Sequence, residues 1–148
     1  MLAKHLKSLR VTVIIFLVLL AIQFEFGMAV NLSDLPSLSP FSLSLSNLLG
    51  ALDQAGAIAL IHASLGTILT ILSVASLIMS LVSRIRSVQV VGVLSCLTTI
   101  LAEANGILFV LSGFQNDNYS HGMATGFILT FGLFFLELYF LKPMQRAK

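Results

Sequence analysis

The segment Ala57–Ser73 reads AIALIHASLGTILTILS, and its apolar character continues to Val82. A helix of roughly 20 apolar residues spans the hydrocarbon core of a bilayer, so this segment is long enough to cross a membrane. A helix is favoured because hydrocarbon offers no water to unpaired backbone groups. The continuous run also differs from the short alternating strands of a membrane β-barrel. The segment therefore predicts a transmembrane helix, with one polar interruption at His62.

The rest of the chain repeats this pattern. Of 148 residues, 57% are hydrophobic and 9% are charged, and the mean hydropathy of +1.03 is far above that of a soluble domain. Short loops between the later spans favour antiparallel neighbours. We therefore predict an all-α fold class, with residues 1–148 forming one integral membrane four-helix up-down bundle. Its spans are expected at about residues 11–30, 57–82, 88–113 and 122–141.

All eight basic residues fall on one side of the predicted spans, where they precede the first span, join the second to the third, and follow the fourth: Lys4, Lys7, Arg10, Arg84, Arg86, Lys142, Arg146 and Lys148. The side that carries Lys and Arg stays in the cytoplasm. We therefore predict a multi-pass protein of the cell membrane with both termini cytoplasmic. Its expected partner is the lipid bilayer and not nucleic acid. Glu137 is expected near the inner surface, as an interfacial residue.

The first span begins like a secretory signal, with basic residues before an apolar run. Gln23 and Glu25 stand where a cleavage site would need small residues, so we expect a retained anchor. Residues 31–56 form the one long connection, which is expected outside the cell. Two prolines near its start oppose a helix there. Serine and leucine then alternate, and we expect a short amphipathic segment on the outer membrane surface.

His62 and His121 lie near the same end of the second and fourth spans. Gly66 shares a helical face with His62, and Thr125 shares one with His121, so each imidazole has room beside it. Small residues also serve ordinary helix packing in membranes, which remains an alternative explanation of this pattern. The second and fourth spans of an up-down bundle are diagonal partners, so the two imidazoles could ligate one iron from opposite faces of a porphyrin. This hypothesis makes His62 and His121 metal ligands and makes these four residues a binding site for haem b.

Four spans with a histidine near the outer ends of the second and fourth resemble one half of a haem A synthase, or equally a b-type cytochrome bundle. The resemblance covers the whole chain in layout and rests on His62, His121 and Glu25. It implies that the two histidines are axial ligands of haem b in electron transfer or haem modification. It also implies that Glu25 or Glu103 is the acidic residue of the chemistry.

Ionisable residues inside a span are costly and often functional. Glu25 should lie at the depth of His62 and could hydrogen-bond to it, as carboxylates do for metal-bound histidines. Glu103 lies nearer mid-membrane. It either forms an interhelical hydrogen bond that fixes the bundle or takes part in proton or ion movement along Glu103, Glu25 and the histidines. A second class of function is a non-catalytic small subunit that packs against a larger membrane or respiratory complex. No phosphate-binding loop, HExxH pair or nucleophile motif is present, so the sequence leaves open whether the chain is an enzyme.

Overall fold

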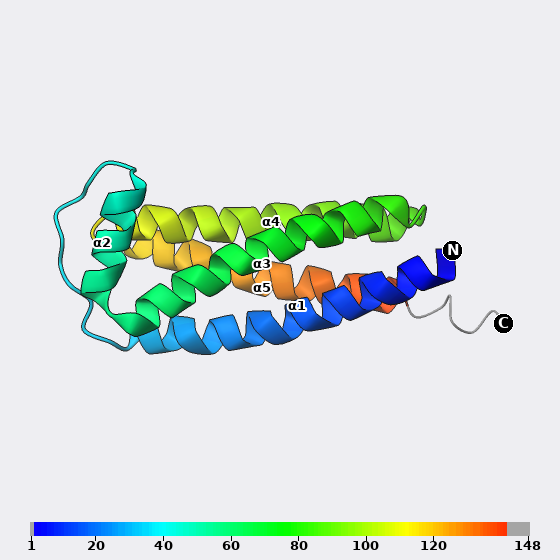
Figure 1. The fold of residues 1–148 in the computed structure, drawn as a ribbon, viewed down its shortest axis with the longest axis horizontal. Coiled ribbons are helices and arrows are strands. Elements are labelled where there is room, and N and C mark those ends of the chain that lie inside the picture. The colour runs from blue at the N-terminus through cyan, green and yellow to red at the C-terminus, as the bar shows by residue number, and fades with distance from the viewer. Residues whose placement is uncertain (1, 142–148) are drawn as a thin grey trace.

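The structure is a computed structural model that describes residues 2–141, and within this range it contains α-helices and no strand. The helices are α1 (Leu2–Asn31), α2 (Leu45–Ala55), α3 (Ala57–Val82), α4 (Arg86–Leu111) and α5 (Asp117–Phe140). Four of them, α1, α3, α4 and α5, are long and apolar enough to cross a membrane. These four lie side by side in a bundle (Figure 1). Lys142, Arg146 and Lys148, on which the charge analysis partly rests, lie outside the described residues.

The four long helices form a ring. α1 packs against α3 and α5, and α4 packs against the same two helices, so α3 and α5 are diagonal to each other. The start of α1, the α3–α4 turn and the end of α5 lie at one end of the bundle, which we call the termini end (Figure 1). α2 lies across the opposite end, which we call the α2 end.

The observed helices differ from the predicted spans at several ends. α1 begins at Leu2, well before residue 11, because Leu6 and Leu9 continue the core-facing spacing of the span through the basic segment. α2 is a fifth helix that the four-span prediction did not count. Its start is fixed by Ser44, whose side-chain oxygen accepts from the backbone N–H of Asn47 at 3.2 Å.

The segment before α2 packs on the turn between α4 and α5. The backbone N–H of Leu38 donates to the carbonyl of Gly113 at 3.2 Å, and that of Phe41 donates to the carbonyl of Leu111 at 3.2 Å. Gly113 has a φ of 68°, and a Cβ there would collide with the carbonyl of Leu38. Glycine is therefore required where the connection crosses the turn.

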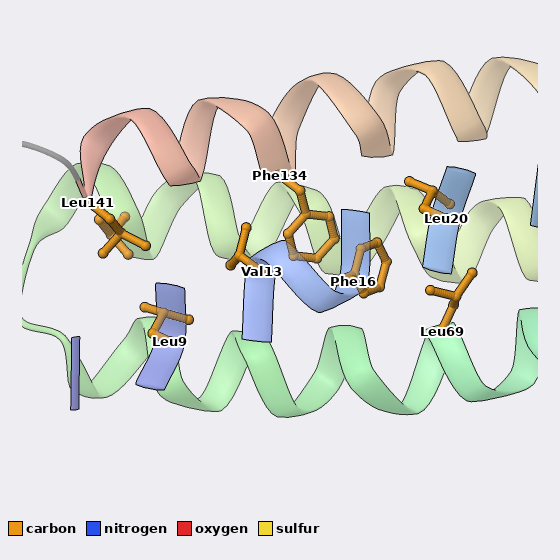
Figure 2. Packing of buried hydrophobic residues seen from close by; sticks show 8 residues of the cluster. Leu9, Val13, Phe16, Leu20, Leu69, Phe134 and Leu141 are labelled. Carbon is orange, nitrogen blue, oxygen red and sulfur yellow. The ribbon is translucent and has the colours of Figure 1, made fainter. Parts of the chain in front are cut away.

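The apolar part of the core is built around α1. Leu9, Val13, Phe16 and Leu20 are spaced three or four residues apart, so they project from one helical face. Figure 2 shows them packed with Leu69 of α3 and with Phe134 and Leu141 at the far end of the chain. The rings of Phe16 and Phe134 lie 4.0 Å apart between centroids. This cluster holds α1 against α3 and α5.

The buried residues between α3, α4 and α5 are mostly small or polar. The small or polar ones are Gly66, Ser73, Ser76 and Ser80 of α3, then Gly92, Ser95, Cys96 and Thr99 of α4, and finally Gly126, Thr130 and Glu137 of α5. The other buried residues of these helices are apolar: Ala59, Leu69, Val88, Val91, Phe109 and Phe134. Small side chains let helix backbones approach closely. A Cβ on Gly126, for example, would stand 2.7 Å from the Cβ of Ala102 on α4. The core is thus divided into an apolar part around α1 and a polar part among the other three long helices.

Two glycines of α5 test this close approach. We expect Gly126→Ala to lower the free energy of unfolding by about 1–3 kcal/mol, because the added methyl group must push α4 away. Gly132→Ala is the matched control, since a Cβ there meets nothing within 4 Å. It should leave stability unchanged or raise it by up to about 1 kcal/mol, because alanine is the better helix former. Unfolding of the purified variants in detergent measures both, and equal effects would contradict the packing described here.

Candidate functional site

His62 of α3 is half-buried and faces α1. A Cβ on Gly27 would stand 3.0 Å from its ring carbon Cε1, so this glycine makes room for the imidazole. The side-chain amide of Gln23 donates to the carbonyl of His62 at 3.0 Å, and its nitrogen lies 3.5 Å from ring atom Nε2. The polar partner of His62 on α1 is therefore Gln23.

Glu25 does not make the hydrogen bond to His62 that the sequence suggested. Two residues along an α-helix turn the side chain by about 200°, and Glu25 is exposed on the side of α1 away from Gln23. Glu25 does lie at the depth of His62, as predicted, because Gln23 and Gly27 on either side of it both contact the imidazole, but it points to another face of α1. The face that continues Leu9, Val13, Phe16 and Leu20 by steps of three and four reaches Gln23 instead.

The structure leaves Gly66 one turn from His62 on α3, but it does not bring His121 or Thr125 to His62. His121 and Thr125 are exposed on α5, whereas Gly66 is buried on α3. Within residues 2–141, no group of three or more His, Cys, Asp and Glu side chains could hold a metal ion. The shared haem stays a prediction. The imidazole of His62 packs on α1 and that of His121 is exposed, so both would have to move to ligate one porphyrin iron.

Glu103 of α4 is half-buried and forms the first of two carboxyl sites, at the edge of the polar part of the core beside exposed Thr67. The hydroxyl of Thr67 donates to Glu103 Oε1 at 3.1 Å and also lies 3.2 Å from the carbonyl of Ala63 in its own helix. A Cβ on Gly66 would stand 2.6 Å from Glu103 Oε2 and 3.3 Å from the amide nitrogen of Gln23. Gly66 therefore makes room for the carboxyl group, which lies one turn from His62.

Glu137 of α5 forms the second carboxyl site, and its predicted interfacial position is wrong. Its side chain is 0% exposed, and the hydroxyl of Ser80 donates to Glu137 Oε1 across the core. Gly92 of α4 makes this contact possible, since a Cβ there would stand 2.7 Å from Ser80 Cβ and 3.5 Å from Glu137 Oε1. The prediction followed from the depth of Glu137 near the end of the span, whereas its burial depends on the helical face from which it projects. Buried Thr130, Phe134 and Leu141 lie on that same face of α5 at helical spacing, and this signal could have found it.

The two carboxyl sites share one arrangement. In the Glu137 site, the hydroxyl of Ser80 lies within hydrogen-bonding distance of Glu137 and of the carbonyl of Ser76, the latter at 2.8 Å. In the Glu103 site, the hydroxyl of Thr67 likewise lies within reach of Glu103 and of the carbonyl of Ala63. A hydroxyl carries one proton and can donate to only one of these acceptors at a time. If the carboxyl group carries a proton, it can donate to the hydroxyl while the hydroxyl donates to the carbonyl. Each site is therefore suited to a carboxyl group that takes up and releases a proton.

A row of hydroxyl groups lies between the two carboxyl sites along the antiparallel contact of α3 and α4, exposed at Thr67, half-buried at Thr70 and buried from Ser73 to Ser80. The contacts of Thr67 with Glu103, of Ser73 with Cys96 at 3.7 Å, and of Ser80 beside Gly92 fix the register. The intervening levels then place Thr70 opposite Thr99 and Ser76 opposite Ser95. The hydroxyl row thus consists of Thr67, Thr70, Ser73, Ser76 and Ser80 of α3 with Ser95 and Thr99 of α4. At about 1.5 Å per residue, its length along α3 is roughly 20 Å.

The buried polar atoms without a hydrogen-bond partner all lie on this row or at its ends. Within the part of the chain that the structure describes, they are Gln23 Oε1, His62 Nδ1, Thr70 Oγ1, Ser76 Oγ, Ser95 Oγ and Glu137 Oε2. Buried polar groups in proteins nearly always have a partner, so each exception calls for an explanation. These atoms lie along one line from the α2 end to the termini end.

The chain matches no known protein family, and no curated protein or solved structure is significantly similar to it.

Two serines of α3 test the Glu137 site. Ser80→Ala removes the hydroxyl partner of a fully buried carboxyl group and should lower the free energy of unfolding by about 1–3 kcal/mol. Ser64→Ala is the matched control, because Ser64 is exposed and donates only to the carbonyl of Leu60, at 2.8 Å. Both variants lose the same kind of bond within the helix, so the difference between them isolates the contact with Glu137. Equal stability of the two variants would show that this contact does not stabilise the bundle.

Proposed function

We propose that this chain is a proton-translocating integral membrane protein in which Glu103 and Glu137 carry the proton. The observation that supports this most strongly is Glu137, which is fully buried with one oxygen bonded to Ser80 and the other unpartnered. It stands at the end of a hydroxyl row that leads to a second carboxyl group. Ionisable residues inside transmembrane bundles characteristically form proton relays.

The proposed orientation has α1, α3, α4 and α5 crossing the cell membrane with the termini end in the cytoplasm. No Lys or Arg occurs from Val11 to Ser83 or from Ser87 to Leu141, so the α2 end carries neither residue. Arg84 and Arg86 are exposed at the termini end, as the positive-inside rule requires of a cytoplasmic loop. α2 would then lie at the outer surface.

The length of the polar line supports a path across the whole bilayer. From His62 to buried Ser83, α3 rises by roughly 32 Å, which matches the hydrocarbon thickness of about 30 Å. Gln23 and His62 would form its outer end, followed by Glu103, the hydroxyl row and Glu137. Ser83 donates to the carbonyl of Ser80 at 2.6 Å and would face the cytoplasmic end.

The proposed relay uses the ability of each hydroxyl to accept one proton while it donates another. A proton arriving at Glu137 passes to Ser80, and the following groups hand protons on toward Glu103. Neighbouring side chains on one helical face are about 5–6 Å apart, which is too far for a direct hydrogen bond. Hydroxyls contributed by α4 and single bridging water molecules would shorten each step. The unpartnered oxygens of Thr70, Ser76 and Ser95 are the groups that such bridges would bond.

The two other hypotheses explain fewer of these observations. A small subunit would use polar residues for assembly, but Glu137 and Ser80 are buried and bonded to each other within this chain. Haem binding by His62 and His121 gives no role to Glu137 or to the hydroxyl row. The proton relay accounts for both.

Proton flux into liposomes tests the proposal. The purified protein should acidify the interior of vesicles, reported by a trapped pH-sensitive dye, when a membrane potential drives protons inward. Glu137→Gln and Glu103→Gln should each reduce the rate to that of protein-free vesicles, because an amide cannot carry the proton. Glu25→Gln is the matched control, since Glu25 is exposed on α1 and outside the row. It should retain the full rate.

Two results would contradict the proton relay. One is a flux that survives both Glu137→Gln and Glu103→Gln. The other is the absence of any flux together with a Soret absorbance band that His62→Ala and His121→Ala each abolish, which would favour the haem hypothesis.

Cysteine labelling tests the orientation separately. In a Cys96→Ala background, Ser46→Cys in exposed α2 should react with a membrane-impermeant maleimide on intact cells. Ser8→Cys, exposed near the start of α1, should react only after permeabilisation. The opposite pattern would reverse the orientation while leaving the relay itself to be judged by the flux measurement.

A further inference from the structure

Several buried oxygen atoms at the Glu137 end of the row have no hydrogen-bond partner, and one proton could bond to only one or two of them. Glu137 Oε2, Ser76 Oγ and Ser95 Oγ have no hydrogen-bond partner, and their side chains are at most 1% exposed. Ser80 Oγ lies beside Glu137 Oε1. By the register of α3 and α4, Ser76 and Ser95 occupy the level next to Ser80. One carboxyl group and three hydroxyls thus gather in the core near the termini end.

These groups suit a hard cation. Carboxylate and hydroxyl oxygens are hard ligands, and hard cations bind to oxygen ligands in proteins. The hydroxyl of Ser80 can donate its hydrogen bond to the carbonyl of Ser76, at 2.8 Å, instead of to Glu137. If Glu137 loses its proton, a lone pair on Ser80 and both carboxylate oxygens become available to a positive charge.

The charge of the site favours a monovalent ion. Within residues 2–141, Glu137 is the only carboxylate of the site, because Glu103 lies at the other end of the roughly 20 Å row. A divalent ion would leave an uncompensated positive charge in a buried core, which is costly. A single positive charge is balanced by a single carboxylate.

We propose that the Glu137 site binds one alkali cation, such as Na⁺, in exchange for the proton of Glu137. This inference deepens the proposed proton relay by naming the ion that competes at one end of it. One proton leaves as one cation enters, so the charge of the core does not change. Cation binding should therefore strengthen as the pH rises, because fewer protons compete.

Among residues 2–141, the other charged and titratable groups toward this end lie on α1 and in the α3–α4 turn, with exposed Tyr139 on α5 and buried Cys96, which contacts Ser73, on α4. Lys4, Lys7, Arg84 and Arg86 are exposed, and Arg10 is half-buried. Ring atom Nε2 of His5 lies 2.9 Å from the carbonyl of Met79. Glu137 contacts Ser80 and lies beside Gly92, so the competing proton is assigned to its own carboxyl group.

Equilibrium binding of radiolabelled Na⁺ to the purified protein in detergent tests this site without any flux measurement. We expect one saturable site whose affinity increases from acidic to alkaline buffer. Glu137→Gln should weaken binding at least about tenfold, because it removes the only charged ligand. Ser76→Ala and Ser95→Ala should each weaken it by roughly fivefold, the effect of losing one polar contact. Ser64→Ala and Glu25→Gln are controls that should bind as the unchanged protein does.

The serine variants keep the test decisive if Glu137→Gln proves unstable, since each removes one oxygen and little volume. Absence of saturable Na⁺ binding at any pH would overturn the cation site. Binding unaffected by Glu137→Gln and by both serine variants would do the same. Proton flux in liposomes without Na⁺ binding would leave the relay standing, whereas Na⁺ binding without proton flux would leave the cation site and overturn the relay.

Discussion

The contact between Glu137 and Ser80 constrains the arrangement of every long helix. A carboxyl group that is 0% exposed needs a hydrogen-bond partner, because burying it alone costs several kcal/mol. Its partner stands on α3, which is diagonal to α5, so the contact must cross the centre of the bundle. Only a residue without a side chain leaves room on α4 between them, and Gly92 is that residue. With three helices drawn together in this way, α1 fills the remaining side with the large residues Phe16 and Leu20.

The division of the core follows from this constraint. Leu, Val and Phe on α1 pack by shape and hold the helix through apolar contact, whereas α3, α4 and α5 approach through glycine and serine. Small residues bring backbones close, and in hydrocarbon this close packing replaces the hydrophobic effect as the force between helices. The same closeness places Ser73 opposite Cys96 and Thr67 opposite Glu103. The packing of these helices and the alignment of their polar groups thus have one cause.

The sequence predicts the long helices well because each rests on a local property, an apolar run of sufficient length. The diagonal relation of α3 and α5 also follows, since short turns leave few ways to connect the spans. The candidate site was predicted less well. Glu103 and Gly66 do meet, but Glu25 and Gln23 differ in face and not in depth, and hydropathy reports only depth. Glu137 was misjudged for the same reason, although the spacing of Thr130 and Phe134 pointed inward. The cross-core contact with Ser80 depends on helix rotation, which no run of apolar residues specifies.

Polar residues between two helices can serve only to hold the helices together, and such residues differ in their hydrogen bonding from residues that pass an ion along. An adhesive hydrogen bond stabilises only when both partners are satisfied, as Thr130 and Thr98 are at 3.0 Å between α5 and α4. A buried hydroxyl without a partner contributes no adhesion and destabilises the fold by roughly 1–3 kcal/mol. Alanine or glycine at positions 76 and 95 would pack the helices equally closely without that penalty. The serines at these positions are therefore poorly explained by packing, and they are the groups on which the proposed relay and cation site depend.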